Sequence, residues 1–464
     1  MNIEDIFIIL IWMILPIGWH YLLKTAGLSL LQVTIPSFVI VFFYFYQYVG
    51  FPILYFQLDP YRAQFVSDKF LMIKVFTFTS ITITLMIVGY IVANKHLGSL
   101  FWRTDVTYVA SQNFFVEKIF PGGARQNIGL VILVLISITV LFVYLTKVGY
   151  QKIAIIIAMG TENDLRSSAR SAMGNSFAGK YHWYKLFMND FLRFTLFAFF
   201  AQYLLNKTIQ KRLILFIIFI ITTFVMVMQT EKGPMANLII ALFLVYILVK
   251  NKGKVPLIKL MFLGGAILSI LIVFYLKFMG RETFGEALSG VFSRSFTGQM
   301  MPAYLYLEYF TQHHDLLLGR SLPNPRAIFP FEHYELTKEI MAWHSPFSYK
   351  KGIVGSMPTV YWGEMYANFG FLGVLIPPFF VGYILYGLNI ILSCLQKNPL
   401  SIALLVWLLM HLKTLSGTSL SGFLLDSYMV GVIASFALLS FYSGRGVIRY
   451  QKRVIQKYLD RVIS

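Results

Sequence analysis

The chain has 464 residues, of which 58% are hydrophobic and 13% are charged, and its formal net charge is +19. Soluble domains carry about a quarter charged residues, so this composition excludes an ordinary soluble protein and indicates a polytopic membrane protein. The basic residues lie between long apolar runs or beside carboxylates and form no nucleic-acid recognition module, so we expect anionic lipid or phosphate, and no nucleic acid, as the partner of the positive charge.

Apolar stretches of about 17–25 residues, each long enough to cross roughly 30 Å of hydrocarbon, recur along the chain. They lie at 4–23, 30–54, 71–93, 127–146, 186–205, 212–229, 234–250, 257–277, 370–393, 400–417 and 424–443. The pattern predicts an all-α polytopic integral membrane protein with about eleven transmembrane helices. We expect residues 1–464 to form a single integral membrane domain without a separate soluble domain.

The distribution of basic residues predicts the orientation of the chain, because short cytoplasmic loops carry an excess of Lys and Arg. The basic connections are those at Lys24, 95–125, 207–212, 250–259, Lys397 and 445–461. With about eleven spans they share one side, which we expect to be cytoplasmic. The N-terminus and the connections 147–185, 230–233 and 278–357 then lie outside.

Two of these outer connections are predicted to be structured. Residues 147–185, with the stretch "GYQKIAIIIAMG", and residues 278–357, with "VFSRSFTGQMMPAYLYLEYFTQ", contain apolar residues at helical spacings and recurring aromatics. This pattern is typical of amphipathic helices at a membrane interface. We therefore predict an outer amphipathic segment at 147–185 and a major extracytoplasmic loop at 278–357 that caps the spans.

Several positive residues of the outer connections lie close to predicted spans. They are Arg166, Arg170, Lys232, Arg281, Arg294, Arg320 and Arg326, the last two within "GRSLPNPRAIFP". Together they indicate a binding site for an anion. The alternative for each one is an ion pair with a loop carboxylate, such as Glu282 or Glu335, or contact with lipid headgroups.

The turn "MQTEKGPMANLI" (228–239) contains Glu231 and Lys232 between two apolar runs. Pro234 is a typical first-turn residue of the helix that follows. Lys232 is therefore expected near a helix N-terminus, where backbone N–H groups and the helix dipole favour an anion such as phosphate. The alternative is a Glu–Lys pair at the level of the lipid headgroups.

The stretch "MPTVYWGEMYANFGFLGVLIPPFF" (357–380) brings Glu364 close to a span. The apolar region from 357 to 393 is too long for one span, so its first part is expected to be an outer or re-entrant helix. Partial burial there would raise the pKa of Glu364 toward that of a useful general base. The alternative is that Glu364 pairs with an arginine and braces the loop.

His333 and His344, in the core of the outer loop, are further catalytic candidates, although a structural role is also compatible with their aromatic surroundings. His313 and His314 are adjacent and do not converge on a metal as i, i+4 pairs do. The sequence contains no phosphate-binding P-loop, dinucleotide fingerprint, nucleophile elbow or Asp-rich metal motif. We therefore expect neither a metal nor a cofactor.

In its layout the chain resembles the O-antigen polymerase family, the Wzy-type oligosaccharide repeat-unit polymerases of bacteria. The resemblance covers nearly the whole chain and includes the basic turn and following helix in "EKGPMANLIIALFLV", the long outer loop that begins at "KFMGRETFGEAL", and "GEMYANFGFLGV". The last stretch carries the pattern Gly-Glu-x-Tyr-x-x-Phe-Gly-x-x-Gly. Many members have an arginine in the basic turn, where this chain has Lys232, which keeps the charge but lacks the bidentate fork.

The resemblance implies a GT-C-like, metal-independent glycosyltransferase at the outer face of the bacterial plasma (inner) membrane. It would transfer a glycan from undecaprenyl diphosphate to a new lipid-linked repeat unit, building lipopolysaccharide O-antigen, capsule or exopolysaccharide. Lys232 and the outer arginines would bind the diphosphate, Tyr366 would contribute to the substrate site, and Glu364, His333 or His344 would accept the acceptor proton. A flippase and a chain-length regulator are the implied protein partners.

Three alternatives remain open. An O-antigen ligase, which moves the finished glycan to lipid A core, would share the architecture. A flippase or other transporter of lipid-linked sugars would explain Lys413, a cation inside an apolar run. A non-catalytic scaffold would leave the outer arginines without a role.

Overall fold

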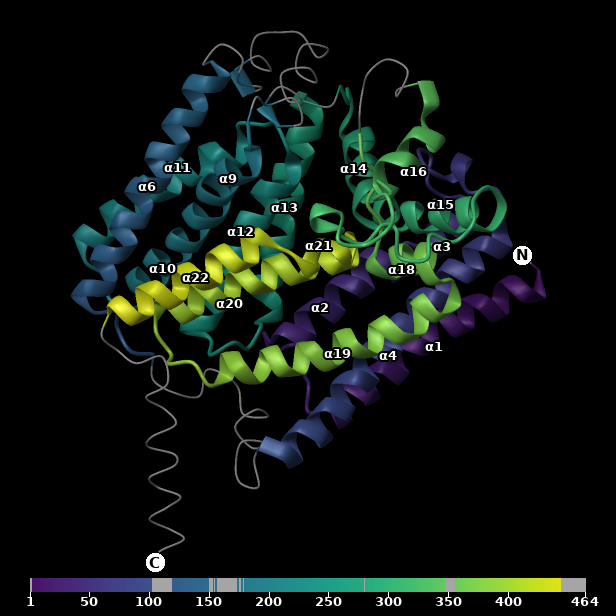
Figure 1. The fold of residues 1–464 in the computed structure, drawn as a ribbon, viewed down its shortest axis with the longest axis horizontal. Coiled ribbons are helices and arrows are strands. Elements are labelled where there is room, and N and C mark those ends of the chain that lie inside the picture. Colours follow the sequence, from purple (N-terminus) through teal and green to yellow (C-terminus); the bar gives the residue numbers. More distant parts are fainter. Residues whose placement is uncertain are drawn as a thin grey trace, which may run out of the picture. The chain divides into compact units, whose positions relative to one another are not determined.

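The computed structural model describes residues 2–101, 119–149, 153, 155–156, 173–174, 177, 179–278, 280–347 and 355–443. These residues are mostly helical and contain no strand, so the prediction of an all-α chain is confirmed for the part that the structure describes (Figure 1).

Ten helices among the described residues are long and apolar enough to cross a membrane. They are Ile3–Thr25, Ile35–Tyr55, Lys69–Leu97, Ala124–Val148, Ile209–Val227, Gly233–Lys250, Leu257–Lys277, Phe371–Ser393, Pro399–Ser416 and Ser421–Tyr442. The protein is therefore a multi-pass membrane protein. The predicted span 186–205 is not among the ten, because a π-helical turn, η4 (Leu186–Phe191), precedes α10 (Leu192–Leu205), which has 14 residues.

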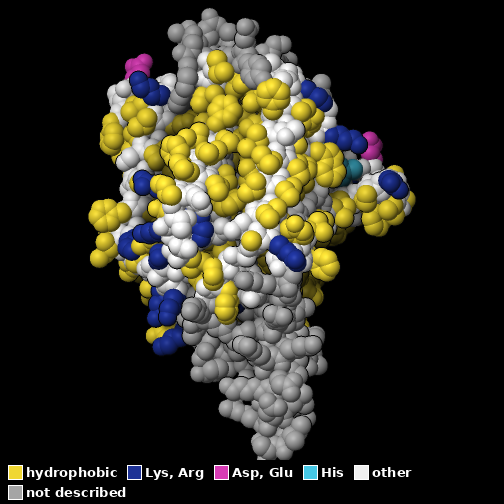
Figure 2. Space-filling view, turned by 90° about the vertical axis from the view of Figure 1, so that its left-hand side faces the viewer, with side chains coloured by type: hydrophobic (Ala, Val, Ile, Leu, Met, Phe, Trp, Pro, Cys, Tyr) yellow, Lys and Arg dark blue, Asp and Glu magenta, His cyan; other side chains and the backbone are white. Residues whose placement is uncertain are grey.

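The surface of the candidate spans is apolar, as contact with lipid requires. In α1 (Ile3–Thr25), Phe7, Ile14 and Ile17 are 63%, 60% and 57% exposed. Hydrophobic side chains also dominate the face drawn in Figure 2, with Lys and Arg side chains scattered among them. Exposed apolar surface on this scale is compatible with a folded protein where lipid covers it.

The chain divides into two compact units, each made of three segments. Unit 1 comprises Met1–Ser111, Leu288–Ile390 and His411–Asp426, and unit 2 comprises Gln112–Ala287, Ile391–Met410 and Ser427–Ser464. Both units contain candidate spans. The division therefore does not separate a membrane domain from a soluble one.

Unit 2 is built around α10. Its helices are α6 (Ala124–Val148), α9 (Tyr181–Lys185), η4, α10, α11 (Ile209–Val227), α12 (Lys232–Lys250), α13 (Leu257–Phe278), the larger part of α20 (Pro399–Leu412) and α22 (Ser427–Tyr442). The buried Asp190 on η4 accepts a hydrogen bond from Trp407 Nε1 at 3.0 Å and pairs with Arg193 at 2.6 Å. A buried carboxylate is tolerated there because both partners satisfy it.

Unit 1 contains the remaining helices. They are α1, α2 (Ile35–Phe43), η1 (Tyr44–Tyr48), α3 (Phe51–Tyr55), η2 (Ala63–Phe65), α4 (Lys69–Phe101), most of α14 (Phe284–Phe292), η5 (Ser293–Thr297), α15 (Gly298–Gln312), η6 (Pro325–Ala327), α16 (Leu336–His344), α18 (Tyr361–Phe369), most of α19 (Phe371–Ser393), η7 (Lys413–Ser416) and α21 (Ser421–Leu424). The sequence predicted amphipathic helices in 278–357, but α15 is buried at consecutive positions from Met300 to Leu307. This helix is therefore part of the core.

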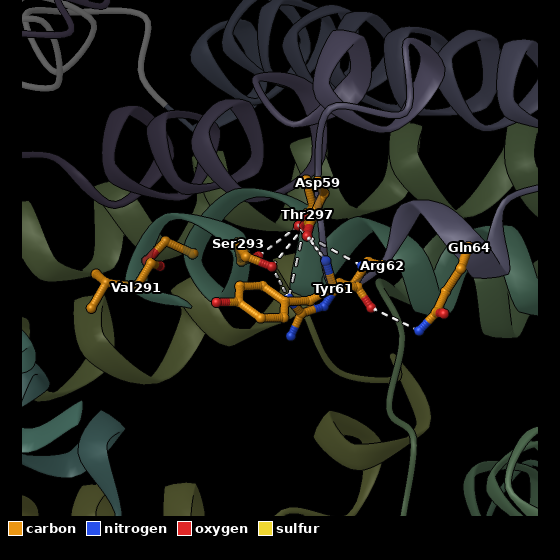
Figure 3. A network of polar contacts seen from close by, with 8 residues as sticks. Asp59, Tyr61, Arg62, Gln64, Val291, Ser293 and Thr297 are labelled. Carbon is orange, nitrogen blue, oxygen red and sulfur yellow. Dashed lines mark hydrogen bonds and ion pairs between the residues drawn. The ribbon is translucent and has the colours of Figure 1, made fainter. Parts of the chain in front are cut away.

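A polar network around Asp59 connects the loop after α3 to η5 in unit 1 (Figure 3). Asp59 is 2% exposed and accepts hydrogen bonds from the backbone N–H groups of Tyr61 (2.8 Å) and Arg62 (3.2 Å). It also accepts the hydroxyl hydrogens of Ser293 (2.7 Å) and Thr297. Arg62 Nη1 lies 3.8 Å from the same carboxylate. With these donors in place, the ionised carboxylate is stable inside the fold.

Candidate functional site

A cavity of about 330 Å³ lies in unit 1, where chain segments far apart in the sequence meet. Its lining residues are Tyr306, Ser321, Pro323, His333, Leu336, Thr337, Thr359, Glu364, Ser419, Ser421 and Gly422. Glu364 lies on α18, directly before the candidate span Phe371–Ser393, and Ser421 begins the candidate span Ser421–Tyr442. The cavity therefore lies at the ends of two candidate spans.

Glu364 forms the buried end of this cavity. Its side chain is 2% exposed, Oε2 accepts the backbone N–H of Ser421 at 3.0 Å, and Oε1 accepts the hydroxyl hydrogen of Ser421. Burial raises the pKa of Glu364, and the hydrogen bonds from Ser421 offset only part of this effect. A buried carboxyl with a raised pKa beside a cavity has the properties of a proton acceptor.

Asp59, in the same unit, is a second buried carboxyl group with which Glu364 can be compared. Asp59 and Glu364 are both 2% exposed. Burial raises the pKa of Asp59 as well, but the hydrogen bonds from Thr297 and Ser293, with those from the backbone, outweigh burial and hold that pKa below its usual value. The net pKa shifts are opposite because burial outweighs the hydrogen bonds from Ser421 and Leu420 at Glu364, whereas the hydrogen bonds outweigh burial at Asp59.

The turn between α18 and α19 depends on two glycines of the sequence pattern. Gly370 ends α18 with φ at +59°, a conformation that L side chains rarely adopt. A Cβ atom at Gly373 would lie 2.0 Å from the backbone oxygen of Met365. The glycines therefore allow the close turn that holds Glu364 next to the start of α19.

Asn368 on α18 fixes the loop that begins with "GRSLPNPRAIFP". Its side chain is fully buried, and Nδ2 donates to Ser321 Oγ (2.7 Å) and to the backbone oxygen of Glu364 (2.8 Å). Its Oδ1 accepts the backbone N–H groups of Gly319 (3.1 Å) and Ser321 (3.4 Å). One amide thus ties the loop wall of the cavity to the helix that carries Glu364.

A second wall of the cavity, the segment with Ser419 and Ser421, is held by a residue near the N-terminus of the chain. Gln47 Nε2 donates to the backbone oxygens of Ser416 (2.6 Å) and Gln299 (3.0 Å). The bond to Ser416 holds the end of η7, and the segment that follows η7 supplies Ser419 and Ser421 to the cavity. The hydrogen-bond donor to Glu364 is therefore positioned by a residue from an N-terminal helix.

Thr359 contributes an unsatisfied hydroxyl to the cavity. The residue is 2% exposed, and its Oγ1 has no hydrogen-bond partner among the described residues. A buried hydroxyl without a partner costs about 1–3 kcal/mol, a cost that a bound ligand or water would remove. Sequence reasoning missed Thr359, because a threonine inside an apolar run carries no signal of its own.

His333 lies at the exposed side of the cavity, so the structure brings it together with Glu364. Its Nδ1 is 3.1 Å from the backbone oxygen of Leu322. A carbonyl oxygen can only accept, so Nδ1 is the donor in this bond and Nε2 is left as the acceptor of the neutral ring. A protonated His333 would lower the pKa of Glu364, in opposition to burial.

Two other predicted residues lie away from the cavity lining. His344, on α16, packs its ring 4.7 Å from the ring of Phe65, and burial lowers its pKa. Tyr366, on α18, packs 5.6 Å from Phe78 of α4. Within the described part of unit 1, neither residue is among those that line the cavity.

The predicted cation cluster is only partly described. Arg294, Arg320 and Arg326 belong to unit 1 and are exposed, and none of these three described arginines lines the cavity. Arg320 lies 5.7 Å from the ring of Tyr334. Arg281 and Lys232 belong to unit 2. The helix α12 begins at Lys232 and has Pro234 in its first turn, but the side chain of Lys232 is outside the described part. Arg166 and Arg170 are also outside the described residues. A shared diphosphate site therefore stays a prediction.

Lys413 is buried in unit 1, with 4% of its surface exposed. Its ammonium lies 4.8 Å from the ring of Phe42 and 5.8 Å from that of Tyr46, so aromatic faces stabilise the charge. Nearby in the chain, His411 Nε2 lies 2.5 Å from Asp426 Oδ2.

In the described part of the chain, no group of three or more His, Cys, Asp or Glu side chains could hold a metal ion. No family model, curated protein or solved structure matches the chain. The cavity and the sequence pattern are therefore the features that bear on function.

Proposed function

We propose that the protein is a glycosyltransferase that polymerises lipid-linked oligosaccharide repeat units into a surface polysaccharide, as the resemblance to O-antigen polymerases implies. The observation that carries the proposal is Glu364, a buried carboxyl with a raised pKa at the end of a hydroxyl-lined cavity. A sugar hydroxyl is a weak nucleophile, and a positioned base is what its transfer chemistry needs.

In the proposed reaction, the oxygen of an acceptor hydroxyl forms a bond to the anomeric carbon of the donor sugar. The bond from that carbon to the diphosphate oxygen breaks, and its electron pair leaves with undecaprenyl diphosphate. Glu364 takes the proton of the acceptor hydroxyl, while Ser421 keeps the carboxylate oriented through its N–H and hydroxyl. Atoms and electrons balance without a further reactant.

The leaving diphosphate needs cations, which stabilise the charge that develops on it. Lys232, Arg166, Arg170, Arg281, Arg294, Arg320 and Arg326 remain the candidates for this role. The proposal also includes the GT-C-like architecture, the outer face of the bacterial plasma membrane as the place of reaction, and the flippase and chain-length regulator as partners.

The buried Lys413 favours one competing function, a transporter of lipid-linked sugars, because charges inside the membrane often mark substrate pathways. An O-antigen ligase would use the same transfer chemistry with a different acceptor. Both can be separated from a polymerase by supplying defined substrates.

The test uses the full chain in lipid vesicles with purified undecaprenyl-diphosphate-linked single repeat units and EDTA. A ladder of longer lipid-linked glycans is expected. Transfer only to added lipid A core would identify a ligase, and movement of the intact lipid across the bilayer without new glycosidic bonds would identify a transporter. Either result, or a strict requirement for a divalent metal, refutes the proposal.

A further inference from the structure

Beside the cavity, unit 1 carries a continuous row of rings that we name the aromatic shelf: Tyr309, His313, His314, Tyr334 and Trp343. The centroid of Trp343 lies 5.3 Å from those of both His313 and Tyr309. Tyr309 stacks on His314 at 5.6 Å with 20° between the planes, and His314 lies 5.4 Å from Tyr334. His313 is exposed and the other four rings are partly exposed.

The shelf lies on the same segments that line the cavity. α15 supplies Tyr306 to the cavity and, one turn later, the first ring of the shelf. The loop before α16 supplies His333 to the cavity and Tyr334 to the shelf. α16 supplies Thr337 to the cavity and Trp343 to the shelf. A ligand that fills the cavity and extends outward along these segments would meet the shelf.

The chemistry of the shelf fits a carbohydrate better than a lipid chain or an apolar peptide. Partly exposed Trp and Tyr rings offer flat apolar area together with a polar tip, which suits the C–H faces and hydroxyl groups of a sugar ring. The imidazoles of His313 and His314 and the hydroxyls of Tyr309 and Tyr334, 3.3 Å apart, add donors and acceptors. The shelf lies on segments outside the candidate spans.

The size of the cavity also indicates that a bound oligosaccharide would extend beyond it. At about 330 Å³ it is at the small end of the roughly 300–1,000 Å³ of ligand sites. Most of an oligosaccharide that places one end beside Glu364 must therefore lie outside the cavity.

We propose that the aromatic shelf binds the sugars of the lipid-linked oligosaccharide that extend beyond the cavity. The inference rests on the proposed function, because it assumes that the cavity receives a sugar. It predicts that affinity increases with the length of the glycan.

The experiment measures competition in the vesicle assay by soluble glycans of one and of three repeat units, released by mild acid from purified lipid-linked material. We expect the three-repeat glycan to bind the wild type more tightly than the single repeat. Trp343→Ala should weaken the three-repeat glycan about two- to ten-fold, as expected for one lost ring contact, and leave the single repeat unchanged. The matched control is Trp183→Ala in unit 2, since Trp183 is 49% exposed and also contacts a histidine, His182, at 5.1 Å.

His313→Ala, at an exposed position, carries the same test if the first variant does not fold, as judged by its melting temperature. The inference is overturned if both shelf variants keep the wild-type length dependence, or if they weaken both glycans equally. A wild type that polymerises without length-dependent binding refutes the shelf alone. A wild type that forms no glycosidic bonds refutes the proposed function.

Discussion

Replacing Glu364 by Gln should nearly abolish glycosyl transfer without weakening the fold. The amide oxygen can still accept the N–H of Ser421, which lies 3.0 Å from Oε2, and the amide nitrogen can donate to the hydroxyl oxygen of Ser421. What the substitution removes is the ability to accept a proton. A general base contributes about 10²–10⁴-fold, so the turnover rate should fall by that factor.

The stability of this variant follows from the sign of the pKa shift. Burial raises the pKa of Glu364, so the folded state disfavours the ionised form. The resulting cost is absent below the unfolded pKa of about 4.3, grows as the pH rises from there to the folded pKa, and stays constant above it. Glu364→Gln should therefore melt at or above the wild-type temperature at neutral pH, and the two melting temperatures should converge at acid pH.

The assay pairs single-turnover transfer of the repeat unit with thermal melts of the purified protein in lipid. Asp59→Asn is the matched control, because Asp59 is buried to the same extent in the same unit. The carboxylate of Asp59 lies 3.8 Å from Arg62 Nη1, and its hydrogen bonds hold its pKa below the usual value, so removing the charge should cost about 1–3 kcal/mol of stability and leave the transfer rate per folded molecule unchanged.

Two results would refute the reasoning. Transfer by Glu364→Gln within about three-fold of the wild type, far from the 10²–10⁴-fold effect of a general base, would exclude this role. A loss of stability as large as that of Asp59→Asn would make Glu364 a brace of the loop. The rising limb of the wild-type pH–rate profile, expected above the usual pKa of a glutamate, should also disappear in the variant.

Three further predictions concern the same unit. The folded pKa of Asp59 is below the unfolded value of about 3.9, so the stability that its carboxylate contributes should be lost as the pH falls through the folded pKa. The melting temperatures of the wild type and of Asp59→Asn should therefore become equal at acid pH, and a difference that persists there would contradict this. Thr359→Val should leave the melting temperature unchanged or higher and raise the acceptor KM about two- to ten-fold, and a wild-type KM would show that no ligand uses the hydroxyl. Asn368→Ala should cost at least about 2 kcal/mol in chemical denaturation, because it strands the N–H groups of Gly319 and Ser321, whereas a loss below about 0.5 kcal/mol would count against the loop-fixing role.

The amino-acid sequence by itself determined the membrane-spanning character of this protein. Each of the ten candidate spans corresponds to a predicted apolar stretch, because the thickness of the hydrocarbon sets the length of every crossing helix and composition alone reveals it. The sequence also singled out Glu364, since an apolar region too long for one span must deliver its first part to the membrane surface. Both inferences depend on local pattern.

Only the tertiary structure decided what surrounds these residues. Ser421, the donor to Glu364, is 57 positions away in the chain, Gln47 and Ser416 are separated by 369 positions, and Asp59 and Ser293 by 234. The difference between a structural carboxylate and a candidate base depends on which donors packing brings to each oxygen, and no local periodicity records those partners. The burial of α15, the open hydroxyl of Thr359 and the row of shelf rings have the same origin, because side-chain environment is set by contacts between distant segments.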